Sequence, residues 1–81
     1  MMPDHLAGVL RMQPSGRWAV CMPGQEPMEV TSGEIFRVEV EGREGLHVTR
    51  MEHAHLGGYY AVEGYPLRDG LRAALGGGDQ D

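Results

Sequence analysis

The stretch Glu34-Ile35-Phe36-Arg37-Val38-Glu39-Val40-Glu41 is the most regular part of this sequence. From Phe36 onward, apolar residues occupy every second position and charged residues lie between them. A β-strand sends alternate side chains to opposite faces of its sheet, so the pattern predicts a strand with one buried and one charged face. Gly42 and Gly45 indicate a turn, and residues 46–53 predict the returning strand of a hairpin.

The same period-two reasoning predicts further short strands around this hairpin. The candidates are residues 5–12, 17–22, 28–30 and 59–62, separated by turn signals rich in Gly and Pro. Gly8 indicates a bulge in the first of them. Trp18 and Phe36 share the parity of their strands' aliphatic residues, which places both in the predicted core. Residues 67–75 fit either a short helix or a last strand that closes a barrel.

Five to six short strands with frequent turns predict an all-β protein that curls into a small antiparallel barrel. We expect one domain over residues 1–75 and a flexible polar tail over residues 76–81. A chain of 81 residues buries only about 60–65% of the surface of its unfolded form. The predicted core is therefore small.

The composition narrows the range of partners. Seven basic residues, all of them arginine, stand against 12 acidic residues, which gives a net charge of -5. This balance argues against direct binding to nucleic acid or to an anionic membrane, and it favours a basic protein partner. The single cysteine, Cys21, excludes an internal disulfide and suggests a reducing cytoplasm. We expect no secretory signal and no membrane span.

Groups that could carry chemistry are few. His47, His53 and His55 share one parity but lack a further ligand at usable spacing, so no metal site is predicted and their role stays open. Cys21 alternates with alanine, which is typical of a small half-buried side chain. The glycine pairs and triplets lack the strand–turn–helix context of a phosphate-binding loop. We therefore predict no catalytic residue, no cofactor and no enzymatic activity.

Candidate binding residues gather around the second hairpin and the turn that follows it. Neighbouring Tyr59 and Tyr60 must point to opposite faces of a strand, so one of them is expected outside. An exposed tyrosine can anchor a protein contact, and carboxylates suit a basic groove. A plain solvated face is the alternative. The candidate contacts for a protein partner are Glu39, Glu41, Glu44, Glu52, Tyr60 and Tyr65.

Several motifs occur in a suggestive order. They are Ser15-Gly16-Arg17-Trp18-Ala19-Val20, the run from Ser32 to Val40, Thr49-Arg50-Met51-Glu52-His53, Gly58-Tyr59-Tyr60, Gly64-Tyr65-Pro66-Leu67 and Gly70-Leu71. In this order the chain resembles an uncharacterised family of small domains of unknown function carried by phages, plasmids and integrative elements. The resemblance covers residues 8–75. It departs from the family's pattern at Leu46-His47, where an aromatic residue is usual, and at Met51, where a branched residue is usual.

The resemblance implies an SH3-like barrel, a short strand or turn rather than a helix within residues 67–75, and an origin in a mobile element. Together with the small size and acidity, it suggests a non-enzymatic inhibitor of a host defence nuclease, of the anti-CRISPR type. The expected partner is then a CRISPR or other defence effector, contacted through the acidic surface. Two alternatives stay open: a module that binds a nucleotide or signal molecule, with a homodimer possible, and an accessory module of a DNA-processing complex.

Overall fold

The computed structural model describes residues 7–77 of the chain. Seven antiparallel strands form a single sheet in the order β3-β2-β1-β7-β4-β5-β6. The strands are β1 (Gly8–Met12), β2 (Trp18–Cys21), β3 (Met28–Glu29), β4 (Ile35–Glu39), β5 (Leu46–Ala54), β6 (Gly58–Ala61) and β7 (Arg72–Leu75). The described residues form no helix, and so none with the length and hydropathy that a membrane crossing requires.

The predicted all-β class is confirmed, and each predicted strand has a counterpart in the sheet. Residues 5 and 6 of the first predicted strand lie outside the described residues. The predicted closed barrel is wrong. The last strand, β7, lies between β1 and β4 in the middle of the sheet, and β3 and β6 remain as two separate edges. The last strand therefore joins the two hairpins instead of closing a ring.

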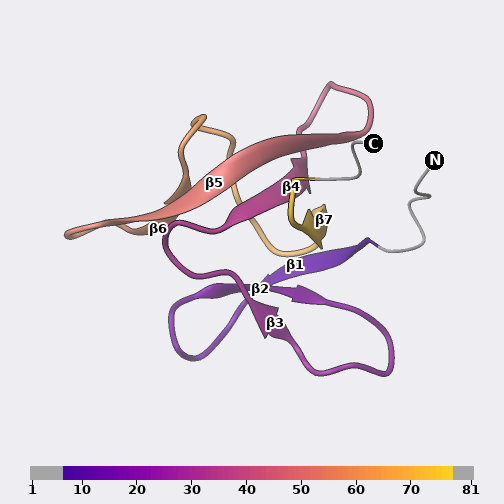
Figure 1. Cartoon of the computed structure of the whole chain (residues 1–81), viewed down its shortest axis with the longest axis horizontal. Coiled ribbons are helices and arrows are strands. Elements are labelled where there is room, and N and C mark those ends of the chain that lie inside the picture. The colour runs from indigo at the N-terminus through magenta and orange to yellow at the C-terminus, as the bar shows by residue number, and fades with distance from the viewer. Residues whose placement is uncertain (1–6, 78–81) are drawn as a thin grey trace.

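The open sheet curls around its own core. In Figure 1, β4, β5 and β6 lie on one side of the molecule, β1, β2 and β3 lie on the other, and β7 lies between them. Both halves turn their apolar faces inward, with a radius of gyration of 11.9 Å. The buried cluster comprises Leu10, Trp18, Val20, Val30, Phe36, Val38, Met51, Ala61, Leu71 and Ala73.

Strand β4 has the alternation that its sequence predicts. Phe36 and Val38 are fully buried, whereas Arg37 and Glu39 are only half-buried on the opposite face. The core positions predicted for Trp18 and Phe36 are confirmed. Ile35, which precedes the alternating run, is exposed on the face of the sheet that points away from the core.

Gly8 has a different role from the predicted bulge. Strand β1 pairs with β2 and β7 in continuous register. A Cβ atom at Gly8 would overlap the backbone carbonyl oxygen of Cys21 and would lie 2.9 Å from Met22 Cγ. Glycine is thus needed because the backbone at the end of β2 passes directly over this position.

The start of the predicted tail is fixed to the sheet. Arg37 donates hydrogen bonds from Nε to the carbonyl of Gly76 at 3.2 Å and from Nη2 to the carbonyl of Leu75 at 3.1 Å. The backbone N–H of Gly76 donates to the carbonyl of Ile35 at 2.9 Å. The remainder of the predicted tail, residues 78–81, lies outside the described residues.

Candidate interaction surface

Glu39 is the acidic candidate most closely tied to the fold. It lies on the outer face of β4, and its Oε1 atom accepts a hydrogen bond from the backbone N–H of Arg72 at 2.9 Å. This bond links β4 to β7, which are adjacent in the sheet. The carboxylate of Glu39 therefore helps to hold two central strands together.

Glu41 and Glu44 lie together in the loop that joins β4 to β5, and both are exposed. Glu41 Oε1 lies 3.9 Å from Arg68 Nη1. The carbonyl oxygen of Glu44 lies 3.0 Å from Nε2 of His47. Arg43 lies between the two glutamates in the same loop. The loop is thus accessible to a partner, but its charges are mixed.

Glu52 and Tyr60 form a second group, at the other end of β5. They face each other in the register of β5 and β6. Glu52 accepts hydrogen bonds from Arg50 Nε at 2.8 Å and from Ser32 Oγ at 3.3 Å. Glu52 lies six positions along the strand from Leu46, which adjoins the loop, and this is a span of about 20 Å. The structure therefore brings Glu41 near Glu44 and Glu52 near Tyr60, but it keeps these two pairs apart.

Tyr65 packs against the core at the loop end of the molecule. Its ring meets the His47 ring edge-on, with the centroids 6.1 Å apart. The guanidinium carbon of Arg43 lies 6.0 Å from the centroid of the same ring. Tyr65 is only half-buried, so part of its surface remains open to a partner.

Of the neighbouring tyrosines, Tyr60 is exposed and Tyr59 packs against the core, which confirms the prediction that one of them lies outside. Tyr59 also forms a contact that the sequence does not reveal. Arg17 Nε donates to its hydroxyl oxygen at 3.1 Å, and Arg17 Nη1 lies 3.6 Å from Glu29 Oε1. The hydrogen bond to Tyr59 is the main reason that the pKa of Arg17 is raised above its ordinary value; Glu29 contributes less.

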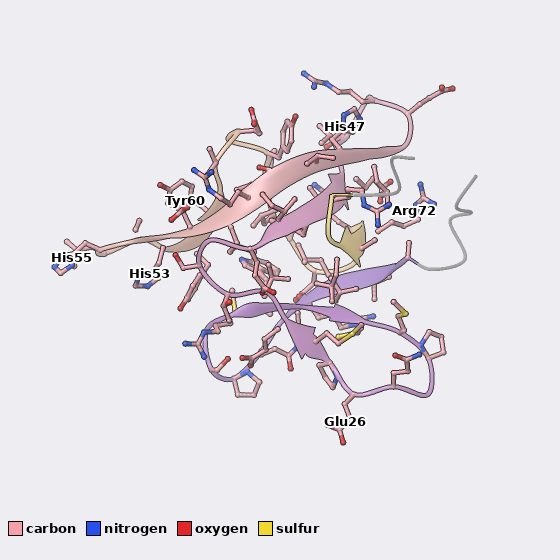
Figure 2. All side chains as sticks on the ribbon, in the orientation of Figure 1. Glu26, His47, His53, His55, Tyr60 and Arg72 are labelled. Carbon is pink, nitrogen blue, oxygen red and sulfur yellow. The ribbon has the colours of Figure 1, made fainter. Side chains whose placement is uncertain are left out.

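The histidines do not converge. Figure 2 shows His47 near one end of β5, with His53 and His55 near the other. The His53 ring rests against Tyr59, with the centroids 4.5 Å apart. Within residues 7–77 there is no group of three or more His, Cys, Asp or Glu side chains that could hold a metal ion, and no pocket. Cys21 is half-buried and forms no disulfide.

The structure also shows an exposed apolar surface of which the sequence analysis predicted only Tyr60. Ile35, Val48, Tyr60 and Val62 are between 42% and 48% exposed. They lie on the side of β4, β5 and β6 that points away from the core, which we call the outer face. The parity of the predicted strand could have revealed Val48, since it shares the side of Arg50, whereas its neighbour Thr49 is buried.

The register of the strands places arginine side chains beside the apolar side chains of this surface. Ile35 lies opposite Arg50, and Val48 lies opposite Arg37. The N–H of Val62 donates to the carbonyl of Arg50 at 2.9 Å. Apolar side chains surrounded by arginine are typical of a protein-binding surface, where the apolar atoms lose water and the charged groups form the rim.

The net charge of the chain is divided between the residues that the structure describes and those outside this range. Residues 7–77 contain nine acidic side chains and seven arginines, a net charge of −2. The other three acidic residues, Asp4, Asp79 and Asp81, account for the rest of the net charge of -5. Attraction to a basic partner would thus depend partly on the two ends of the chain.

Comparison of this chain with protein-family models, with curated proteins and with solved structures found no match. The resemblance to a family of mobile-element domains therefore stays an expectation.

Proposed function

We propose that this protein is a non-enzymatic interaction protein that binds a protein partner through the outer face. The observation that carries the proposal is the row of exposed apolar side chains over β4, β5 and β6, of which Tyr60 is the largest. Tyrosine and arginine are the residue types most often found at energetic centres of interfaces. Tyr60 lies opposite Glu52, and Glu52 is paired with Arg50, so all three residues adjoin one patch.

The finer proposal concerns the partner. We infer a basic, nucleic-acid-binding protein, and specifically a defence nuclease of a bacterial host that an anti-CRISPR-type inhibitor of a phage or mobile element would block. The net charge of -5 supports this choice, as do the exposed carboxylates of Glu41 and Glu44. The resemblance to mobile-element domains, with its SH3-like barrel, supplies the biological setting. Complementary charge would mainly raise the association rate.

Substitutions on the outer face test the first proposal. Val48→Asp places a charge in the middle of the face, and Tyr60→Ala removes its largest side chain. Met12→Asp is the matched control, because Met12 is 44% exposed but belongs to β1, outside the face. With a purified CRISPR nuclease as the partner, we expect each outer-face variant to weaken binding by roughly tenfold or more and the control to leave it unchanged. Equal binding by Val48→Asp, Tyr60→Ala and wild type would exclude the outer face.

Charge reversal tests the finer proposal. The variant Glu41→Arg/Glu44→Arg changes only exposed loop residues and leaves Glu39 in its bond to Arg72. We expect slower association with the nuclease, with wild-type association also slowing as salt rises. The assay is inhibition of DNA binding by the nuclease across a salt series. Inhibition that is indifferent both to salt and to this substitution would remove the loop carboxylates from the mechanism, and the outer face would be judged separately.

A further inference from the structure

Strand β6 is an edge of the sheet that lacks the usual protection. Among the strands of residues 7–77 it pairs with β5 alone, and its residues are Gly58-Tyr59-Tyr60-Ala61. Natural edge strands are commonly blunted by charged side chains, proline or great shortness. The opposite edge, β3, has these features: it is two residues long, follows Pro27 and contains Glu29. Strand β6 contains no charge and no proline, so its backbone is open to pairing.

The register identifies which backbone groups face outward. The hydrogen bond from the N–H of Val62 to the carbonyl of Arg50 fixes the alternation of the β5–β6 pair. Residues of an antiparallel pair point their N–H and C=O groups alternately toward the partner strand and away from it. Tyr60 therefore points these groups toward β5, whereas Tyr59 and Ala61 point theirs to the free edge. The carbonyl of Ala61 also accepts from Gly64 N–H at 2.8 Å, which uses one of its two lone pairs.

We propose that β6 pairs with β6 of a second copy of this chain, antiparallel, about a two-fold axis that passes beside Tyr60. In that register Tyr59 lies opposite Ala61 of the second copy, and the two residues exchange N–H···O=C hydrogen bonds. The symmetry repeats the same exchange on the other side of the axis. All of the outward N–H and C=O groups of Tyr59 and Ala61 then have a partner. A second copy of this chain is therefore sufficient to complete the edge.

The side chains suit this pairing. On the inner face, the large ring of Tyr59 would lie opposite the small Ala61. On the outer face, Tyr60 would lie opposite its own copy, and aromatic pairs across antiparallel strands are stabilising. The charges that adjoin the two tyrosines are paired within each copy, Glu52 with Arg50 at 2.8 Å and Arg17 with Glu29 at 3.6 Å, so the approach does not bring unpaired like charges together. The dimer would join the outer faces of both copies, and it does not depend on the proposed function.

Disulfide trapping tests the register. Tyr60→Cys, in a Cys21→Ser background, places two thiols directly opposite each other at a non-hydrogen-bonded site, with Cα atoms about 4.5 Å apart, which suits a disulfide. Val62→Cys in the same background is the control, since Val62 has similar exposure but its two copies would lie about 13 Å apart. Under mild oxidation we expect a covalent dimer from the first variant and monomer from the second. Equal cross-linking of the two variants, or none in either, would overturn the proposed register.

A charge exchange tests the symmetry without a covalent bond. Tyr60→Glu and Tyr60→Arg each place like charges opposite each other, so each variant alone should sediment as a monomer, whereas wild type has twice the mass of one chain. An equal mixture of the two variants should regain the mass of a dimer, because opposite charges then meet. Circular dichroism of each variant shows whether it is folded. Wild type that sediments as a monomer at millimolar concentration, or a mixture that remains monomeric, would refute the pairing.

Discussion

The hydrogen bond from Arg17 Nε to the hydroxyl oxygen of Tyr59, 3.1 Å long, joins residues 42 positions apart in the chain. Arg17 precedes β2, and Tyr59 lies in β6, the last strand of the other half of the sheet. Because Arg17 also pairs with Glu29 of β3, one guanidinium connects both edge strands of the open sheet. This contact bridges the two edges where a closed barrel would have paired strands.

Tyr59→Phe should loosen this bridge while preserving the packed ring. We expect a small decrease in the urea midpoint of unfolding, because Arg17 loses its acceptor but can still be solvated. Tyr60→Phe is the matched control, since no partner of the Tyr60 hydroxyl lies within residues 7–77. Equal midpoints for the two variants would mean that the hydroxyl of Tyr59 contributes nothing measurable to stability.

The pH dependence of this bridge follows from the raised pKa of Arg17. A cation whose pKa is raised by folding stabilises the fold below its unfolded pKa, and the contribution disappears as the pH rises through the folded pKa. Both pKa values lie far above neutral pH, because arginine is protonated throughout the range in which proteins are usually handled. The difference in urea midpoint between wild type and Tyr59→Phe should therefore stay constant between about pH 6 and pH 9. A difference that changed with pH in this range would point to another titrating group.

Phe36→Ala should be severely destabilising. Phe36 is fully buried in the middle of the core, and truncation of such a ring costs about 3–5 kcal/mol. A domain of this size has a total stability of about 5 kcal/mol, so we expect a largely unfolded chain. Ile35→Ala is the control, because the adjacent side chain is exposed and its loss should cost no more than about 0.5 kcal/mol. Denaturant titration followed by circular dichroism measures both effects.

Glu39→Ala and Glu41→Ala should differ although the two residues are almost adjacent. Glu39 accepts a hydrogen bond from the backbone of Arg72, and its loss leaves that N–H group without this acceptor at a cost of about 1–2 kcal/mol. Glu41 lies exposed in the loop near Arg68, so its removal should cost less than about 0.5 kcal/mol. Chemical denaturation of both variants tests the contrast. If both cost the same, Glu39 has no special structural role.

Gly8→Ala should also destabilise the protein. The added methyl group would overlap the carbonyl of Cys21, and the required shift of β1 against β2 should cost about 1–3 kcal/mol. Gly57→Ala is a suitable comparison, because its nearest neighbour, Ala54 Cβ, would lie 3.4 Å away. Thermal unfolding of the two variants provides the measurement. A melting temperature of Gly8→Ala equal to that of wild type would show that the two strands move apart easily.

The sequence determined the strands and most of the buried side chains. Alternation in residues 34–41 was enough to place Phe36 and Val38 in the core and Glu39 on the opposite face, because a strand's pleat has a fixed period of two. Neighbouring Tyr59 and Tyr60 were separated by the same rule. These features depend only on local geometry, which the order of residues specifies directly.

Only the tertiary structure decided which strands are neighbours and which charges meet. The sequence could not show that β7 lies between β1 and β4, since the pairing of distant strands depends on the packing of the whole core. That position gave Glu39 its bond to Arg72 and left β6 as an open edge. A period of two determines which face a side chain occupies, but the order of strands in the sheet determines its neighbours.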